Sequence, residues 1–166
     1  MGETLEKLLD LETEDVMKGR FLSFQIGGEL YGIEIRTIVE IIGIQPITEV
    51  PEMPAYVKGI INLRGSIIPV MDVRLRFKIA PRDYDDRTCV IVIQLGTAQV
   101  GLIVDGVSEV LSIADEDISD RPHIGGAAGG GYIRRIGKAG RQVIQLVDCS
   151  LLLSGQEEDA ISGLSA

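Results

Sequence analysis

The sequence predicts an all-β protein in which two small barrels share one hydrophobic core. Three observations lead to this fold class: the composition of the core, a period-two alternation of apolar residues, and an internal repeat. The 166 residues include no Trp, 3 Phe and 4 Tyr, so Ile, Val and Leu must fill the core. β-Branched residues pack well on pleated surfaces, and roughly five short strands in each half suit a small barrel.

The internal repeat covers most of the chain and sets the architecture. Aligning Gly32 with Gly101, an offset of 69 positions, places FQIGGELYGIEIRTIVEII (24–42) on IQLGTAQVGLIVDGVSEVL (93–111). Gly59 then aligns with Gly131 at an offset of 72, and SIIPVMD (66–72) aligns with QVIQLVD (142–148) at an offset of 76. We expect the four-residue insertion in a hairpin turn, which is tight at Arg64-Gly65 and longer in GKAGR (137–141), because turns tolerate insertions.

The remaining elements follow in chain order. Residues 1–20 are predicted to be an acidic leader or a short amphipathic helix with Leu5, Leu8 and Leu9 on one face. From Phe21 the alternation predicts a β-hairpin, which opens a first unit of about 21–78. The polar segment 78–86 is a predicted connector to a second unit of about 87–154, and residues 155–166 form a predicted flexible tail.

Two aspartates, Asp72 and Asp148, each end a predicted strand and precede an apolar segment. An aspartate accepts hydrogen bonds from the free N–H groups at a helix start, so each is predicted to cap a short helical turn that plugs its barrel. Pro69 lacks a backbone N–H, which predicts an edge strand or a bulge. Cys89 and Cys149 lie in or beside apolar runs and are predicted to be free thiols.

The charge and hydropathy patterns argue against several kinds of partner. A net charge of −9 opposes binding to nucleic acid or to an anionic membrane surface. Apolar runs fall short of the ~20 residues needed to cross a bilayer, and the start of the chain lacks the pattern of a secretion signal. We therefore expect a cytoplasmic protein that does not insert directly into a membrane.

The sequence offers no constellation of side chains for catalysis, a cofactor or a metal. Asp105-Gly106 is followed by Val107, whereas an aspartic protease needs Asp-Thr-Gly or Asp-Ser-Gly. The glycine-rich run 125–131 precedes a strand-like segment instead of opening a helix, so we interpret it as a connector. The single histidine, His123, leaves neither a catalytic triad nor a set of metal ligands. We predict a protein that is not an enzyme; an enzyme or small-ligand carrier built on the duplicated barrel is the alternative.

Arg64 is the most informative charge, because it separates two apolar runs in GIINLRGSIIPVMD (59–72). Periodicity alone favours a charge that decorates a tight turn. Outward apolar residues beside a few charges are nevertheless candidates for recognition, although alternation along a strand assigns about half of any such set to the core. The candidates that correspond in the two units are Ile38, Glu40 and Ile41 in the first and Val107, Glu109 and Val110 in the second.

Three segments resemble the CheW-like domain family of bacterial chemotaxis coupling proteins, in the order of that family. They are LYGIEIRTIVEII (30–42), VKGIINLRGSIIPVMDVR (57–74) and VGLIVDGVSEVL (100–111). The resemblance identifies residues 21–154 as a CheW-like domain. It implies two intertwined SH3-like five-stranded β-barrels around a shared hydrophobic core, with short helical segments, strands exchanged between the barrels as one possibility, and no cofactor.

The resemblance also implies a function. A CheW-like protein is expected to be a non-catalytic adaptor in the cytoplasm that joins methyl-accepting chemoreceptors to the regulatory domain of the histidine kinase CheA in membrane receptor arrays. An adaptor for another chemosensory kinase, such as one that controls surface motility, is the alternative. The resemblance places the receptor tip in the groove between the barrels and assigns no kinase-binding residue. The receptor-binding residues that it implies are Ile38, Glu40, Lys58, Gly59, Arg64, Val107 and Val110.

Overall fold

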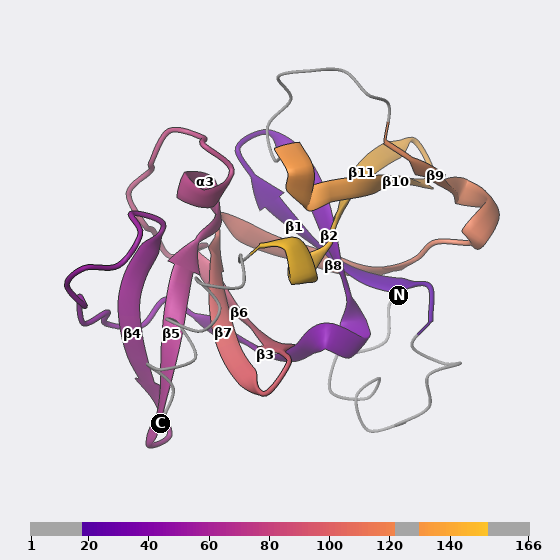
Figure 1. The fold of residues 1–166 in the computed structure, drawn as a ribbon. Coiled ribbons are helices and arrows are strands. Elements are labelled where there is room, and N and C mark those ends of the chain that lie inside the picture. The colour runs from indigo at the N-terminus through magenta and orange to yellow at the C-terminus, as the bar shows by residue number, and fades with distance from the viewer. Residues whose placement is uncertain (1–17, 122–129, 153–166) are drawn as a thin grey trace.

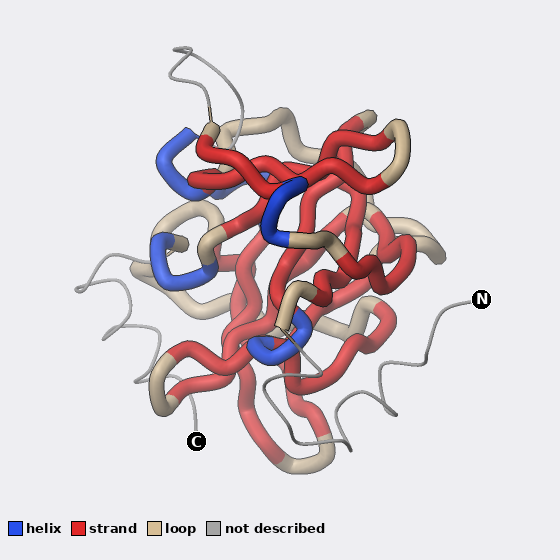
Figure 2. The backbone as a smooth tube through the Cα atoms, turned by 90° about the vertical axis from the view of Figure 1, so that its right-hand side faces the viewer, coloured by secondary structure: helices blue, strands red, loops and turns tan. Residues whose placement is uncertain are grey.

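The computed structural model describes residues 18–121 and 130–152, and residues 1–17, 122–129 and 153–166 lie outside this description. The strands are β1 (Arg20–Ile26), β2 (Glu29–Glu34), β3 (Ile38–Gly43), β4 (Val57–Leu63), β5 (Ser66–Asp72), β6 (Cys89–Leu95), β7 (Ala98–Val104), β8 (Gly106–Ser112), β9 (Ile118–Asp120), β10 (Ile133–Ala139) and β11 (Gln142–Val147). Short helical turns are η1 (Ile35–Thr37), α3 (Val73–Arg76), η2 (Asp115–Asp117), η3 (Gly130–Tyr132) and η4 (Cys149–Leu151). The helical turns are short links between long runs of strand (Figure 2).

The strands form two sheets, and each sheet takes strands from both halves of the chain (Figure 1). The six-stranded sheet has the order β8-β1-β2-β11-β10-β9, and the five-stranded sheet has the order β3-β6-β7-β5-β4. The first two strands of each unit therefore pair with the last three of the other, and β9 is an addition to the second. The predicted fold class, two intertwined SH3-like barrels, is confirmed.

The exchanged strands join through short parallel ladders that depend on two glycines. Gly32 of β2 faces Leu146 of β11, and Gly101 of β7 faces Val70 of β5. A Cβ on Gly32 would lie 3.1 Å from Leu146 Cδ2, and a Cβ on Gly101 would lie 2.7 Å from Val90 Cγ1 and 2.8 Å from Val70 Cγ1. A side chain at either position would displace the buried neighbours, which explains why both units keep glycine there.

Equivalent contacts in the two units correct part of the predicted repeat. The offset of 69 agrees with the matching roles of Gly32 and Gly101. The offset of 72 for residues 59–61 is wrong, because the carbonyls of Tyr56 and Tyr132, 76 positions apart, accept equivalent hydrogen bonds. The donors are the backbone N–H groups of the two cap residues, Asp72 and Asp148, and the N···O distances are 2.7 and 2.9 Å. The offset of 76 therefore holds for the whole second half of the unit.

The insertion lies elsewhere than in the predicted hairpin turn. Arg64-Gly65 and Gly140-Arg141 both make two-residue turns, so the second turn is not longer. The change of offset from 69 to 76 means that seven residues, and not four, are added, and they lie between β8 and β10. Most of the glycine-rich run 125–131, together with His123, falls outside the described residues.

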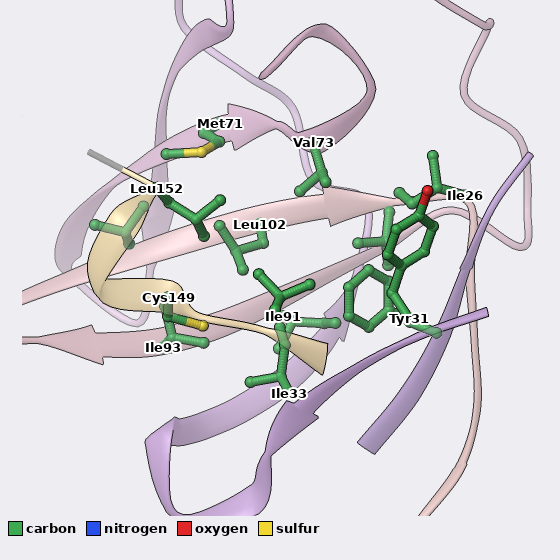
Figure 3. Packing of buried hydrophobic residues seen from close by; sticks show 14 of the residues in the cluster. Ile26, Tyr31, Ile33, Met71, Val73, Ile91, Ile93, Leu102, Cys149 and Leu152 are labelled. Carbon is green, nitrogen blue, oxygen red and sulfur yellow. The ribbon is translucent and has the colours of Figure 1, made fainter. Parts of the chain in front are cut away.

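The buried side chains form one central cluster between the sheets and a smaller cluster within each barrel. The central cluster joins residues of both units, such as Tyr31 and Ile33 with Ile91 and Leu102 (Figure 3). One smaller cluster lies within the barrel formed by the five-stranded sheet, and the other lies within the barrel formed by the six-stranded sheet. All three clusters contain residues of both units, because the strands are exchanged between the barrels, so the shared core is confirmed.

The two predicted aspartate caps and the two predicted free thiols are confirmed, and the predicted edge position of Pro69 is wrong. Asp72 caps α3 by accepting hydrogen bonds from two backbone N–H groups, and Asp148 caps η4 in the same way through one. Cys89 and Cys149 are free, as predicted. Pro69 does not mark an edge strand, because β5 lies between β7 and β4. Pro69 is tolerated because Ile60, its partner on β4, needs no N–H donor from it. The Ile60 N–H donates to the Thr48 carbonyl oxygen, and the Ile60 carbonyl oxygen accepts from the Thr48 N–H, at 2.9 Å each.

Within the described residues, no helix has the length and apolar character required to span a bilayer.

Candidate functional site

The candidate site is built on the tight turn between β4 and β5. Arg64 and Gly65 both have positive φ, 53° and 88°, as a type I′ hairpin turn requires. The Asn62 side chain accepts a hydrogen bond from the Gly65 N–H at 2.9 Å, which fixes the turn. The turn therefore projects the Arg64 side chain from the end of the barrel, where 71% of it is exposed.

The Arg64 side chain binds Glu40 of β3. One guanidinium nitrogen, Nη2, donates to Oε1 at 2.6 Å and to Oε2 at 2.8 Å. β3 and β4 are the two end strands of the five-stranded sheet, so this ion pair connects the ends of the curled sheet. Exposed ion pairs contribute only about 0–1 kcal/mol, so the pair orients the two side chains more than it stabilises the fold.

Gly59 and Lys58 occupy a bulge on β4 beside the segment that follows β3. Gly59 has a φ of 145°, and a Cβ there would lie 2.0 Å from the Thr48 carbonyl oxygen. The glycine is buried and permits the close approach at which Thr48 pairs with Ile60. Lys58 is half-buried at the bulge, where the ladder to β5 shifts register. Gly59 thus shapes this surface without presenting a side chain.

The predicted apolar residues divide between core and surface. Ile38 is only 3% exposed and belongs to the central cluster, so its side chain is not available as a contact surface. Val107 and Val110 are partly exposed on β8, the end strand of the six-stranded sheet, and pack against that cluster. The structure brings Glu40 and Arg64 into contact and places the two valines on the other sheet.

Equivalent bulges in β3 and β8 support the correspondence of the two units. The ladder of β3 shifts register between Ile38 and Glu40, and the ladder of β1 with β8 shifts opposite Ser23. The Ser23 hydroxyl of β1 accepts a hydrogen bond from the Glu109 N–H of β8 at 3.1 Å and donates to the Glu109 carbonyl oxygen at 2.9 Å. Bulges bend a strand locally and re-aim side chains, and beside these bulges Glu40 is half-buried and Glu109 is exposed.

A partly buried ion pair that the sequence did not indicate links several elements. Arg74 of α3 donates to both carboxylate oxygens of Asp105, at 2.8 and 2.6 Å, and the two side chains are 14% and 11% exposed. Asp105 also accepts from the Gly27 N–H at 2.8 Å and from Arg82 at 3.3 Å. Burial opposes ionisation, but the bonds from Arg74, Gly27 and Arg82 outweigh it and hold the pKa of Asp105 below its ordinary value.

Arg76 is a second residue whose role sequence reasoning missed. Its guanidinium lies 4.3 Å from the ring centroid of Tyr56 and 4.8 Å from that of Tyr132. It also donates to the Leu152 carbonyl oxygen at 2.6 Å. The two tyrosines are equivalent in the repeat, so one cation joins both units at their centre. The recurrence of Tyr 76 positions apart was the available signal, and the misplaced offset of 72 hid it.

The described residues do not form a metal site. They contain no group of three or more His, Cys, Asp or Glu side chains placed to hold a metal ion. Burial raises the pKa of Cys149 to about 12, so that thiol stays protonated at neutral pH. The exposed features are instead charged and apolar side chains on strands and turns. The fold and this surface define a class: a pair of intertwined SH3-like barrels whose candidate site is a surface for binding another molecule.

Comparison with known proteins identifies the family within that class. Residues 20–157 match the family model described as CheW-like domain, and the chain belongs to this family. It is 40% identical over 137 residues to Chemotaxis protein CheW of Klebsiella aerogenes, which covers 82% of each chain. It is also 35% identical over 139 residues to Probable chemotaxis protein CheW of Rhizobium etli, covering 84% of this chain and 90% of that one.

Further relatives extend the comparison. The crystal structure of scaffolding protein TtCheW from Thermoanaerobacter tengcongensis superposes with a TM-score of 0.77 at 32% identity, covering 84% of this chain and 94% of the other. Protein FrzA of Myxococcus xanthus is 28% identical over 149 residues, covering 86% of this chain and 89% of FrzA. The resemblance stated from the sequence is therefore confirmed.

Proposed function

We propose that the protein is a non-catalytic adaptor that couples the cytoplasmic tips of chemoreceptors to the histidine kinase CheA. The observation that carries the proposal is membership of the CheW-like family along residues 20–157. Relatives that match most of their own length are named chemotaxis proteins, and the related crystal structure is of a scaffolding protein. The adaptor is expected in the cytoplasm, held at membrane receptor arrays through protein contacts.

The proposed receptor surface combines charged and apolar positions of the two barrels. Direct contacts are assigned to Glu40, Lys58, Arg64, Val107 and Val110, which have half-buried or exposed side chains. The buried Ile38 and Gly59 support this surface from beneath. A charge at the rim of an apolar groove mainly sets the register and the association rate of a bound helix.

Arg64 can meet a partner while it remains bound to Glu40. Among the described residues, only its Nη2 atom donates hydrogen bonds, and the other guanidinium nitrogens remain available. Guanidinium presents its N–H groups in a fixed planar fork, so the bond to Glu40 orients the remaining donors. Glu40 is accordingly proposed to aim Arg64 at the receptor.

Reconstitution tests the adaptor role. Receptor fragments and CheA are mixed with and without the protein, and incorporation of phosphate into the kinase is followed. We expect kinase activity under receptor control only when the protein is present. Kinase activity that is indifferent to the protein would refute the adaptor role.

Charge reversal tests the receptor surface. Arg64→Glu is expected to lower receptor binding by about tenfold, because the rim cation becomes an anion beside Glu40. The double variant Glu40→Arg/Arg64→Glu restores the internal pair with its direction reversed, and it should remain defective if the orientation of the cation matters. Arg87→Glu, at an exposed arginine two residues before β6, is the matched control and should bind like the unmodified protein.

An adaptor role for a different chemosensory kinase is the second candidate. The observation in its favour is the similarity to FrzA over 149 residues, at 28% identity. Replacing CheA in the reconstitution with kinases of other chemosensory systems separates the two candidates. Coupling to one of those kinases and not to CheA would favour the second.

A further inference from the structure

The β10–β11 hairpin concentrates positive charge in an acidic chain. Residues 133–147 hold four cations and no acid, so the hairpin carries +4 while the rest of the chain carries −13, for a total of −9. Within the part of the chain that the structure describes, Arg135 alone of the four forms an ion pair, with Glu34 at 3.3 Å. The other three, Arg134, Lys138 and Arg141, are exposed.

An exposed apolar side chain lies next to this charge. Val143 is 58% exposed, more than any other large apolar side chain in the described residues. It is directly opposite Lys138 in the antiparallel ladder, and paired residues project from the same face of a sheet. Half-buried Ile136 lies on that face two residues before Lys138, and Arg141 lies at the tip of the hairpin. Cationic and apolar groups thus share one face.

The two hairpin turns differ in the position and in the partner of their arginine: at the offset of 76, Arg64 corresponds to Gly140 and Gly65 corresponds to Arg141. In the first barrel the turn arginine, Arg64, is held by Glu40. The position of Glu40 corresponds to Glu109 in the second barrel, which is exposed and forms no ion pair among the described residues. The second hairpin therefore leaves its turn cation, Arg141, without an internal carboxylate.

We propose that the turn end of the β10–β11 hairpin is a docking surface for an acidic, partly apolar segment of a partner protein. The cations supply a local attractive field that the remainder of this acidic chain would not, and Val143 supplies apolar contact. Two acidic groups border this face: Glu29, which accepts a hydrogen bond from Gln145 at 2.6 Å, lies at the far end, and the exposed turn Asp115–Asp117 lies on the β9 side of β10, where Ile118 pairs with Gly137. Both repel carboxylates, so the site is confined to the turn and the β11 side of the hairpin. The proposal is independent of the function assigned to Arg64.

Binding of a labelled peptide of repeated Glu-Glu-Leu-Leu units, followed by fluorescence anisotropy, tests the proposal. Lys138→Glu/Arg141→Glu should weaken binding by about tenfold or more, and Val143→Ser should weaken it several-fold. Binding should also weaken as salt is raised. Lys18→Glu/Arg87→Glu makes the same change of charge at exposed sites elsewhere and should retain binding. Arg64→Glu should retain it as well, which separates this surface from the proposed receptor surface.

Several outcomes would overturn the proposal. Equal losses in both double variants would show an effect of net charge alone. Tighter binding of single-stranded DNA, with no effect of Val143→Ser, would indicate a site for phosphate groups. Binding that occurs only after removal of residues 1–17 would identify the acidic leader of the chain as the occupant. Circular dichroism establishes that each variant is folded before its binding is compared.

Discussion

The largely buried ion pair between Arg74 and Asp105 should contribute measurably to stability. Asp105→Asn leaves the Arg74 guanidinium, only 14% exposed, without its counter-charge. Breaking a fully buried pair by removing one partner costs about 3–5 kcal/mol, and partial exposure reduces the expected loss here to about 2 kcal/mol. Urea unfolding should show this loss at pH 7, and Asp86→Asn, at an exposed position, should be nearly neutral. A loss below about 1 kcal/mol for Asp105→Asn would mean that solvent already screens the pair.

The same carboxylate should contribute to acid denaturation. The pKa of Asp105 is lowered in the folded protein, chiefly because the bond from Arg74 outweighs burial, and it returns to its ordinary value of about 4 on unfolding. Its contribution is therefore complete above about pH 4 and is lost as pH falls through the lower folded pKa. The difference in unfolding free energy between the unmodified protein and Asp105→Asn should shrink from pH 7 to pH 3. A difference that is constant across this range would exclude the titration of Asp105.

Gly59 allows a test of close backbone approach. Gly59→Ala would set a Cβ 2.0 Å from the Thr48 carbonyl oxygen at a φ of 145°, so the segment around residue 48 must move. We expect a loss of about 3 kcal/mol in thermal or urea unfolding. Gly43→Ala, which has no atom within 4 Å of the added Cβ, should change stability little. Equal effects in the two variants would show that the contact with Thr48 is not maintained.

The predictability of single residues depends on how far away their partners are. Asp72 and Asp148 could be predicted as caps because a cap bonds to N–H groups two or three residues ahead. Asp105 could not be assigned in the same way, because Arg74 lies 31 positions away and reaches it only in the folded barrel. The contact of Arg64 with Glu40, 24 positions apart, is of this second kind.

At the scale of elements, alternation predicted the strands but misjudged one alignment. Strand side chains repeat with a period of two, so offsets of 72 and 76, which differ by four, place the same residues on the same faces. Burial patterns alone therefore cannot separate the two alignments. The hydrogen bonds at Tyr56 and Tyr132 separate them, and they exist only once the strands have met. The added strand β9 arises in the region where sequence offered no pattern.

The parallel junction of β5 and β7 is an element whose strength can be tested. Gly101→Ala would place a methyl group 2.7 Å from Val90 Cγ1 and 2.8 Å from Val70 Cγ1 in a fully buried site. Overpacking of this kind costs about 1–3 kcal/mol. Gly28→Ala, in an exposed turn with no neighbour within 4 Å, is the control. Hydrogen exchange should show faster exchange in β5 and β7 of Gly101→Ala, and uniform exchange across both sheets would argue against a local junction effect.

At the scale of the whole molecule, the exchange of strands determines what can fold alone. Alternation predicts which face of a strand is buried, but it does not predict which strand lies beside it. The repeat therefore predicted two barrels of five strands, while the mixing of halves was implied only by the family resemblance. In the structure the first half supplies three strands of one sheet and two of the other. Neither half retains a complete sheet when it is separated from its partner.

Fragments cut in the connector provide the corresponding test. Residues 1–83 contain β1–β5, and residues 84–166 contain β6–β11, so each fragment lacks the parallel junctions at Gly32 and Gly101. Each fragment alone also exposes its part of the central cluster, which draws on both halves. We expect the separate fragments to lack the dispersed amide NMR spectrum of a folded protein and to regain it when they are mixed in equal amounts. Because mixing replaces a linked chain with a bimolecular reaction, the stability of the mixture should rise with concentration. A fragment that folds by itself, with cooperative unfolding, would show that one half can form a barrel without strands from the other.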